Sequence, residues 1–529
     1  MYTKNIEKSI IYGHYNIGIG NIPRCFFIYI VNREVIRMQR KIFTCVILVI
    51  VILLSLTGCG STDLQALAKD LNTYTMDIVY NEDHTLTVEQ TVEYTNQTDV
   101  VLDRLCFHLY ANAFRNEDST LKPVSSYNKL RAYPNGFSSG SIDISKVYVT
   151  RNTVQFATGG AENNILIVPL TDAIYPNESV EVRMEYTVTI PNVYHRFGYG
   201  EQTINLGNFY PIACVYEDGD FVQDGYHANG DPFYSDMANY DVTISYPNTL
   251  MLASTGESVM SVEKNGKIIQ RIEASVVRDF AVVLCDQWLC KSQEVNGTTF
   301  NYYYYKDENS DTTFQAMIDA VTTFESLLGD YPYSTLTAVQ ANFIHGGMEY
   351  PNLILISDDI ELKNEIIQVT VHEIGHQWFY NLVGNNEVKE AWLDEALTEY
   401  ITAMFFEINT TYEVSFTDIC ANYLNSYQLF VDVYTEVFGE VDTSMNRTLS
   451  QFNSEPEYTY LVYVKGFLML NNIRTILGDS VFCLGLRTYF ENNKYDIATT
   501  ADFISAFQKA SHKDVQGIIN SWLEGNVII

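Results

Sequence analysis

Two histidines four residues apart mark the place where this sequence concentrates its chemistry. His372 and His376 enclose Glu373 in the order His-Glu-Ile-Gly-His. Residues four apart lie on one face of an α-helix, so both imidazoles can reach one tetrahedral metal ion. Glu373 would project beside that ion, where a carboxylate can hold and deprotonate water. The alternative is a helix on which two histidines align without a metal.

A second stretch offers a third ligand. Trp392-Leu-Asp-Glu-Ala-Leu-Thr-Glu399 begins another amphipathic pattern, and Glu395 lies within it. Two histidines and one glutamate, with the fourth position open for water, form the catalytic rather than the structural pattern of zinc coordination. Glu399 lies one turn further and is positioned to accept the N–H of a ligand histidine, which would fix the orientation of that ring. An ordinary exposed helix glutamate is an equal alternative for Glu399.

The elements that must position these side chains fall into two regions. Residues 74–295 alternate apolar and polar side chains with period two, as in 85–94 and 180–190, and Asn, Gly, Pro and Asp clusters separate the runs. This pattern predicts an all-β, mostly antiparallel domain. Residues 296–529 change to helical spacing, first at 312–328. We therefore predict an α+β multidomain chain with its site in the helical part.

The motifs together resemble a known family. H-E-x-x-H followed after 18 residues by Glu is similar to the aminopeptidase-N-like zinc metallopeptidases of the gluzincin group. Upstream, Gly346-Gly-Met-Glu349 resembles the family's G-x-M-E-N stretch, and downstream Tyr463-Val-Lys-Gly466 matches its Y-x-K-G. The resemblance covers most of residues 75–525. It implies an N-terminal antiparallel β domain, a thermolysin-like and mainly helical catalytic domain, and one Zn²⁺ per chain.

The resemblance also implies roles for residues outside the zinc motif. Glu349 would bind the free α-ammonium of a peptide, in a substrate-binding stretch that the resemblance extends over Gly346, Gly347 and Met348. Tyr463 would stabilise the oxyanion of the tetrahedral intermediate. Tyr458 and Tyr460 are the alternatives for that phenol.

The sequence departs from the family at two points. Tyr350 stands where the family usually has Asn, so we expect a different shape for the pocket that receives the substrate N-terminus. The sequence given ends at Ile529, roughly where the family's catalytic domain would end. We therefore expect a more open cleft, able to accept longer or folded termini.

The first 58 residues read as a targeting segment. They carry seven Lys/Arg against two Asp/Glu, and a basic stretch ending at Lys41 precedes an apolar run from Ile42 to Leu56. Leu-Thr-Gly-Cys59 then resembles the bacterial lipobox, which implies acylation of Cys59 and anchoring in membrane lipid. An uncleaved membrane anchor is the alternative. We predict residues 1–58 as an over-extended start plus signal peptide, and 59–73 as a linker.

The overall charge narrows the function further. A net charge of −33 argues against nucleic-acid binding, which needs a basic surface. We predict a bacterial, lipid-anchored zinc aminopeptidase that hydrolyses N-terminal residues from peptides at the outer face of the cytoplasmic membrane. One alternative is an endopeptidase or tripeptide-releasing peptidase on the same zinc site. The other is a zinc-containing surface binding lipoprotein without catalysis.

Overall fold

The computed structural model describes residues 8–10, 30–32 and 64–527. The chain divides into two units, Met1–Asp63 and Leu64–Ile529. In the first unit, β1 (Lys8–Ile10) pairs antiparallel with β2 (Ile30–Asn32). The expected signal peptide core, its lipobox and Cys59 lie outside the described residues. Within the described parts of the chain, no helix is both long and apolar enough to cross a bilayer.

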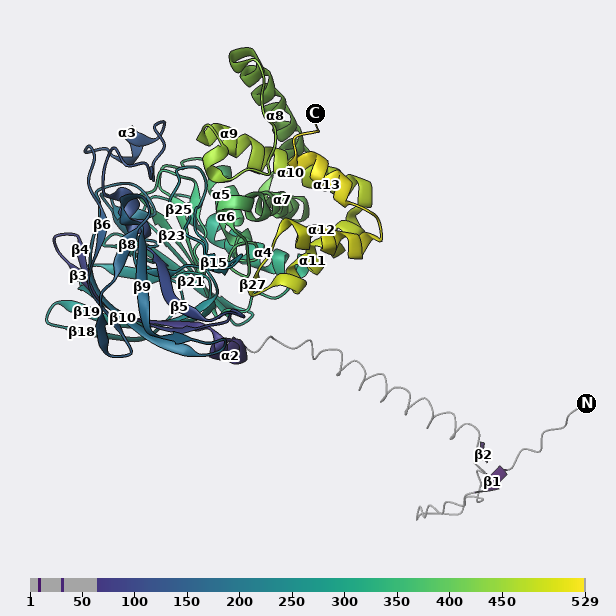
Figure 1. Cartoon of the computed structure of the whole chain (residues 1–529). Helices are drawn as coiled ribbons and strands as arrows, with labels where there is room; N and C mark the ends of the chain where they lie inside the picture. The colour runs from purple at the N-terminus through teal and green to yellow at the C-terminus, as the bar shows by residue number, and fades with distance from the viewer. Residues whose placement is uncertain (1–7, 11–29, 33–63, 528–529) are drawn as a thin grey trace, which may run out of the picture. The chain divides into compact units, whose positions relative to one another are not determined.

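An eight-stranded sheet dominates the first half of the second unit (Figure 1). Its strands alternate buried and accessible side chains, the period-two pattern of a half-buried sheet. All neighbours pair antiparallel except β16 and β3, which are parallel. In sheet order the strands are β18 (Glu257–Lys264), β19 (Lys267–Val277), β16 (Ala238–Pro247), β3 (Asn72–Asn81), β4 (Thr85–Thr95), β10 (Ser179–Thr189), β6 (Ser141–Val149) and β7 (Asn152–Val154).

Smaller antiparallel sheets accompany the large one. The first contains β11 (Phe197–Tyr199), β12 (Thr203–Leu206), β20 (Val282–Cys285) and β17 (Met251–Ser254). The second contains β13 (Ile212–Ala213), β5 (Leu102–His108), β9 (Ile165–Ile174) and β8 (Ala157–Gly159). A two-stranded sheet joins β14 (Tyr216–Glu217) to β15 (Asp220–Phe221). The region therefore has the all-β character that its sequence pattern predicts.

A five-stranded mixed sheet supports the site. Its order is β21 (Leu289–Val295), β22 (Thr298–Tyr304), β23 (Thr335–Ala341), β25 (Leu353–Ser357) and β24 (Gly347–Met348). The first two strands form a hairpin that straddles the predicted domain boundary at 295/296. Since β21 is an edge strand of the five-stranded sheet, it belongs structurally with the catalytic region. The division into two domains stays a prediction, because 64–529 form one compact unit.

Helices make up most of the remainder and gather on one side of the unit, opposite the large sheet (Figure 1). The longer ones are α4 (Ser310–Leu327), α5 (Lys363–Gly375), α7 (Trp392–Ile408), α8 (Phe416–Phe438), α10 (Gly466–Leu477), α11 (Asp479–Asn493), α12 (Thr500–Ser511) and α13 (Gln516–Leu523). Shorter ones are α2 (Leu64–Leu67), α3 (Lys129–Ala132), α6 (Glu387–Glu390) and α9 (Glu455–Thr459). A β domain followed by a mainly helical domain confirms the predicted fold class. Within the predicted linker 59–73, the structure forms the short helix α2 and the turn after it.

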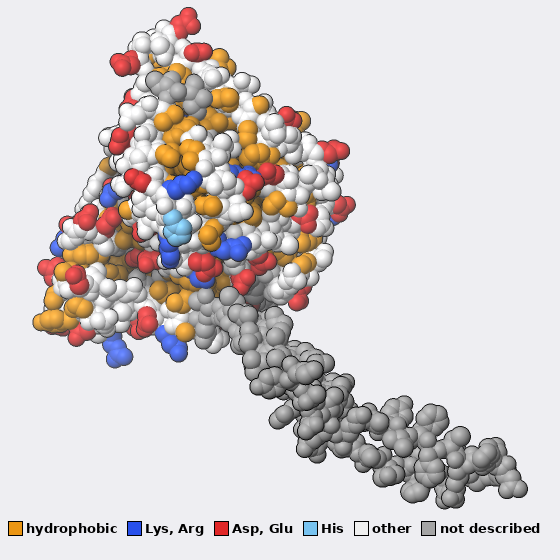
Figure 2. Space-filling model, turned by 90° about the vertical axis from the view of Figure 1, so that its right-hand side faces the viewer, with side chains coloured by type: hydrophobic (Ala, Val, Ile, Leu, Met, Phe, Trp, Pro, Cys, Tyr) orange, Lys and Arg blue, Asp and Glu red, His pale blue; other side chains and the backbone are white. Residues whose placement is uncertain are grey.

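Acidic side chains are scattered over the surface of the unit, with fewer Lys and Arg between them (Figure 2). The face shown in the figure has no large basic patch.

Candidate active site

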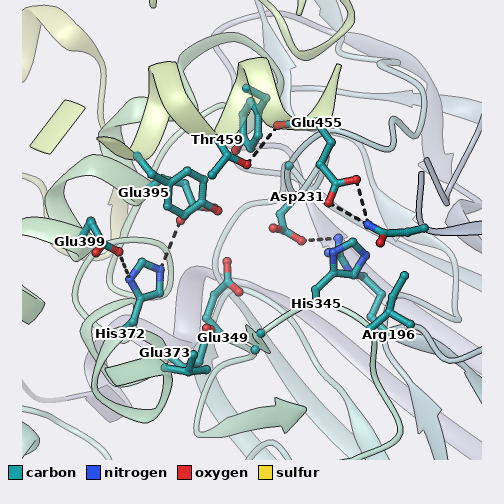
Figure 3. A pocket seen from close by; sticks show the side chains of 18 of the residues that line it. Arg196, Asp231, His345, Glu349, His372, Glu373, Glu395, Glu399, Glu455 and Thr459 are labelled. Carbon is teal, nitrogen blue, oxygen red and sulfur yellow. Dashed lines mark hydrogen bonds and ion pairs between the residues drawn. The ribbon is translucent and has the colours of Figure 1, made fainter. Parts of the chain in front are cut away.

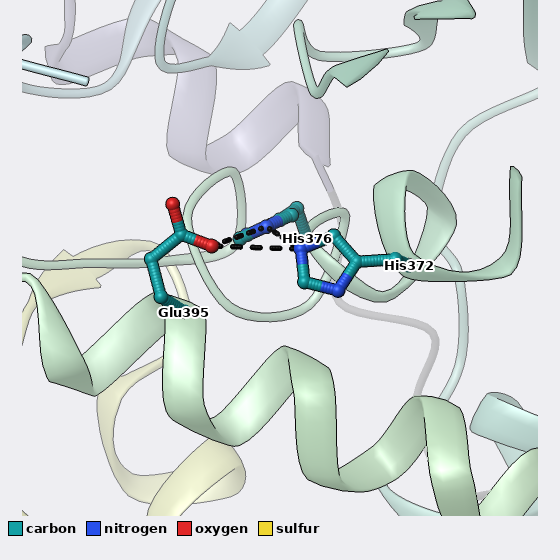
Figure 4. A group of neighbouring side chains, drawn as sticks. All are labelled: His372, His376 and Glu395. Atoms are coloured by element: carbon teal, nitrogen blue, oxygen red, sulfur yellow. Dashed lines mark hydrogen bonds and ion pairs between the residues drawn. The ribbon is translucent and has the colours of Figure 1, made fainter. Parts of the chain in front are cut away.

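Three side chains converge where α5 ends and α7 begins. The Nε2 atoms of His372 and His376 lie 3.1 Å apart, and Glu395 Oε2 lies 3.5 Å and 3.3 Å from them (Figure 4). Two ligands about 2.0–2.1 Å from a tetrahedral ion lie about 3.3–3.4 Å from each other. The three atoms are therefore spaced as ligands of a single ion.

The surroundings of these atoms also fit a cation. Glu395 Oε2 is buried and has no hydrogen-bond partner within the described protein. His376 Nδ1 lies 2.9 Å from the Phe379 carbonyl oxygen, which only accepts, so the proton stands on Nδ1 and Nε2 keeps its lone pair. Burial opposes a charge on His376, yet the carboxylates of Glu349 and Glu395 raise its pKa to about 10. The same negative field favours a divalent metal.

Glu399 occupies the position that the helical spacing predicted. Its Oε2 lies 2.9 Å from His372 Nδ1, on the side of the ring away from the other ligand atoms (Figure 3). A carboxylate there holds the proton on Nδ1 and leaves Nε2 of His372 free for a metal. The structure thus favours the orienting role of Glu399 over an exposed helix glutamate, since its residue is about 8% exposed.

Local sequence explains why the two ligand helices pack so closely. Of the 17 residues of α7, 15 are buried, among them both glutamates of the site. Asp394 and Glu395 lie in its first turn, where the helix dipole stabilises negative charge. Gly375 in α5 faces Thr398 and Ile401 of α7, and a Cβ at 375 would come within 2.9 Å of Thr398 Cγ2. The glycine in His-Glu-Ile-Gly-His lets the helices approach.

Tyr463 lies in a π-helical segment, Tyr460–Lys465, between α9 and α10. Its hydroxyl donates a hydrogen bond to Glu395 Oε1, which places the phenol beside the metal ligands. Lys465 anchors the segment by donating to the carbonyl oxygen of Trp522 at 2.9 Å and to that of Thr443. Gly466 lies against Ala396, where a Cβ would overlap the alanine methyl. The Y-x-K-G pattern therefore sets the position of the phenol.

The Gly-Gly-Met-Glu stretch forms the edge of the five-stranded sheet. Gly347 lies so close to Glu373 that a Cβ there would overlap Glu373 Oε1, so any larger residue would have to displace the Glu373 side chain. Glu349 follows the strand; it is about 3% exposed, its Oε1 has no described partner, and it lines the cavity (Figure 3). Met348 differs from the expectation. Its side chain is fully buried and does not line the cavity, because successive strand residues face opposite sides.

Gln377, just past the zinc motif, joins this strand to α5. Its Nε2 donates to the carbonyl oxygens of Glu349 and Tyr350 at 3.3 Å and 3.2 Å, and its Oε1 accepts from the Asn352 N–H at 2.9 Å. The carboxylate of Glu349 and the zinc ligands are thereby held on one rigid frame.

A cavity of about 630 Å³ opens over these groups. Besides the predicted residues Gly346, Gly347, Glu349 and the metal cluster, its wall contains Arg196 and Asp231, which sequence reasoning missed (Figure 3). These two form an ion pair, and both side chains are largely buried. Asp231 lies in the stretch Gly230-Asp-Pro-Phe-Tyr234, which is similar to the N-terminal β domain of the family, but this similarity assigns Asp231 no chemical role. Arg196 had no signal at all.

Tyr350 points away from the cavity. Its hydroxyl donates to Asn208 Oδ1 at 3.0 Å, and the ring is fully buried against Gly207, where a Cβ would overlap the phenol oxygen. The departure from the family's Asn therefore acts at the junction with the β region. Tyr350 itself contributes no surface to the cavity.

Two carboxyl groups that face the cavity, Glu373 and Glu349, have raised pKa values. Burial raises the pKa of Glu373 to about 7, although the histidines oppose this shift. Burial also raises the pKa of Glu349 well above its usual value. A carboxylate with a pKa near neutrality is suited to take up and return a proton. A positive group near Glu349 would favour its ionised form.

Comparison with known proteins agrees with this geometry. The family model described as Peptidase family M1 domain matches residues 312–522. Those residues are similar to the peptidase M1 domain, which agrees with the resemblance that the sequence motifs carry. The metal of this family is zinc, and the spacing, burial and chemistry of the His372, His376 and Glu395 donors fit it.

Curated relatives share part of the chain. Aminopeptidase N from Lactococcus lactis subsp. lactis is 28% identical over 195 residues, which are 35% of this chain and 22% of the relative. Human endoplasmic reticulum aminopeptidase 2 is 24% identical over 297 residues, which are 52% of this chain and 30% of the relative. The chain thus matches less than a third of the length of these relatives.

A solved structure shares the whole fold. An M1 zinc metallopeptidase variant from Deinococcus radiodurans, bound to a Tyr-Ser-Ala substrate, superposes with a TM-score of 0.61. The alignment covers 87% of this chain and 95% of that one at 15% sequence identity. The likeness extends over the β region as well as the catalytic domain.

Proposed function

We propose that this protein is a zinc aminopeptidase that removes N-terminal residues from peptides. The observation that carries the proposal is the placement of Glu349. Its carboxylate is buried, has an oxygen without a described partner and faces the cavity that also holds the metal cluster. A substrate with a free α-ammonium would neutralise this group and position the first peptide bond.

His372, His376 and Glu395 would hold Zn²⁺, which would supply Lewis acidity toward the scissile carbonyl and lower the pKa of water. Glu373 accepts the proton of the attacking water and then donates it to the leaving amine. The phenol of Tyr463, beside Glu395, donates a hydrogen bond to the oxyanion that develops on the carbonyl oxygen. The free edge of β24 offers backbone groups to an extended peptide.

Asp231 adds to the charge balance of the cavity. Arg196 pairs with Asp231 on the wall that also carries Glu349; burial raises the pKa of Asp231, and the positive charge of Arg196 opposes that shift. The cavity wall carries more carboxyl groups than guanidinium groups: Asp231, Glu349, Glu365, Glu373, Glu395, Glu399 and Glu455 against Arg131 and Arg196. This excess of acidic groups favours a substrate with a positively charged, unblocked N-terminus.

The proposal is tested by blocking the substrate amine. A tripeptide with a free N-terminus and its N-acetylated form are incubated with the zinc-loaded protein, and products are separated by chromatography. Cleavage of the first bond in the free peptide alone is the expected result. Equal cleavage of both peptides would instead support the endopeptidase alternative. Stoichiometric zinc without any turnover would support the binding lipoprotein.

We further propose that the enzyme acts outside the cytoplasmic membrane, anchored through acylated Cys59. Support comes from the order of a basic stretch, an apolar run and Leu-Thr-Gly-Cys in the sequence. Mass spectrometry of protein extracted from the membrane should find a mature chain that begins at Cys59 and carries lipid. A mature chain that begins upstream, or an unmodified Cys59, would remove this part of the proposal.

A further inference from the structure

A tyrosine on α8 reaches the back of the metal cluster. The Tyr423 hydroxyl donates a hydrogen bond to Glu399 Oε1, and the other oxygen of Glu399 lies 2.9 Å from His372 Nδ1. The contacts thus run from α8 through α7 to α5, where His372 directs Nε2 at the other ligand atoms. Tyr423 does not line the cavity, so its effect on the site would pass through Glu399.

The position of the Tyr423 hydroxyl allows it to restrain the Glu399 carboxylate. A glutamate has three rotatable bonds, so a single contact with the imidazole leaves its carboxylate free to turn. Here one oxygen accepts the hydrogen bond of the tyrosine and the other lies 2.9 Å from His372 Nδ1, so two contacts restrain the carboxylate plane. The Tyr423 ring is held in turn by an edge-to-face contact with Phe467, at 4.8 Å between ring centres. Burial and the nearby Glu399 raise the pKa of Tyr423 well above 10, so the hydroxyl remains a donor.

We propose that Tyr423 is a positioning residue of the zinc site. By orienting Glu399, it fixes the tautomer and the ring direction of His372 and thereby strengthens zinc binding. The inference rests on the proposed function only in requiring that zinc occupies this cluster. It differs from a packing role, in which the hydroxyl merely satisfies its own hydrogen bond and zinc affinity would not depend on it.

The test is Tyr423→Phe, which removes one oxygen and keeps the ring. Zinc affinity is measured by competition with a chromogenic chelator. We expect roughly tenfold weaker binding, in the range typical for loss of an outer contact to a ligand histidine. In zinc-saturated protein we expect kcat to fall while KM for an aminoacyl reporter stays constant. Zinc affinity equal to that of the wild type would overturn the proposal.

The same helix provides a matched control. Tyr434 is also on α8, and its hydroxyl forms a hydrogen bond of 3.0 Å with Ser454 Oγ, without contact to a ligand or to Glu399. Tyr434→Phe should therefore leave zinc affinity unchanged. An equal loss in both variants would mean that the loss reflects damage to α8, which also overturns the proposal. Thermal unfolding of the metal-free proteins checks that each variant folds.

A double-mutant cycle separates action through Glu399 from any other route. If Tyr423 works through that carboxylate, adding Tyr423→Phe to Glu399→Gln should change zinc affinity little further. Fully additive losses would contradict the proposal. None of the zinc measurements uses a substrate, so a protein that binds zinc as expected but cleaves no peptide would refute the proposed function and leave this inference standing.

Discussion

The two walls of the cavity are built in different ways. The helical wall comprises His372, His376 and Glu395, with Glu399 behind them: His372 is on α5, His376 directly follows that helix, and both glutamates are on α7. The β wall comprises Arg196, Asp231 and Glu349, which lie in three segments far apart in sequence. The helical wall has the spacing that binds a metal, whereas the β wall presents charge to the substrate. One wall therefore follows from local geometry and the other from long-range packing.

The largest expected effect is a loss of kcat when Glu373, next to the helical wall, is substituted. Glu373→Gln keeps the shape of the side chain but removes the base, so kcat should fall by about a thousandfold or more. Zinc content, measured by elemental analysis, should remain near one per chain. His376→Ala is the contrasting variant, since it removes a ligand and should lose zinc as well. Near-normal turnover by Glu373→Gln would refute the assignment of the base.

The next largest effect is a loss of kcat when Gly347, at the edge of the five-stranded sheet beside Glu373, is substituted. A methyl group at Gly347 would overlap Glu373 Oε1, so Gly347→Ala must displace the base. A shift of about 1 Å in a reacting group can cost about a hundredfold in rate, and we expect a loss in kcat of that order. Gly346→Ala should cost much less, because its Cβ would lie an ordinary 3.4 Å from Val369. Equal kcat values for the two variants would contradict this contact.

A smaller effect, on KM, is expected when Asp231 of the β wall is substituted. Asp231→Asn removes one negative charge from the cavity and leaves Arg196 unbalanced, so KM for peptides with a free amine should rise by about tenfold. Zinc content should not change. Asp359→Asn removes a comparable carboxylate from a more exposed pair with Arg131 and serves as the control. A change in zinc content with unaltered KM would place Asp231 with the metal instead.

The smallest effect is in the pH profile. Glu373 acts as a base only when ionised, and burial raises its pKa from an ordinary 4.5 to about 7. The rate should therefore fall as the pH drops through the raised value, while bound zinc, being positive, lowers that value somewhat. An acid limb between pH 4.5 and 7 in kcat is expected. Constant kcat down to pH 4.5 would show that the base is not held in a buried site.

Prediction from sequence succeeded where the chain repeats a simple period. The strands of the β region followed from the period-two alternation of apolar and polar side chains. The helix α4 followed from apolar side chains at helical spacing. The one-turn step beyond Glu395 left Glu399 with two equal interpretations, contact with a ligand histidine or an exposed position, and the 2.9 Å distance to His372 Nδ1 favours the first. These features depend on residues close together in the chain.

Prediction failed where neighbours come from distant segments. Met348 is a local exception: it was assigned to the substrate site together with Glu349, but strand alternation turns its side chain away from the cavity. Asp231 lay within a recognised stretch, yet nothing in that stretch indicated that it faces the metal cluster. Tyr423 is one of 39 tyrosines, and no local pattern distinguishes it from the others.

The sequence by itself determined the metal ligands, the base and the order of the two regions, because helical and strand periods act over a few residues. Only the tertiary structure decided which charges face the substrate and which hydroxyl holds Glu399. Those contacts join β24, α5, α7 and α8 with segments of the β region through packing of the whole core. The pKa value of an ionisable side chain depends on its burial and on the charges near it in space, so it is set only when the chain is folded.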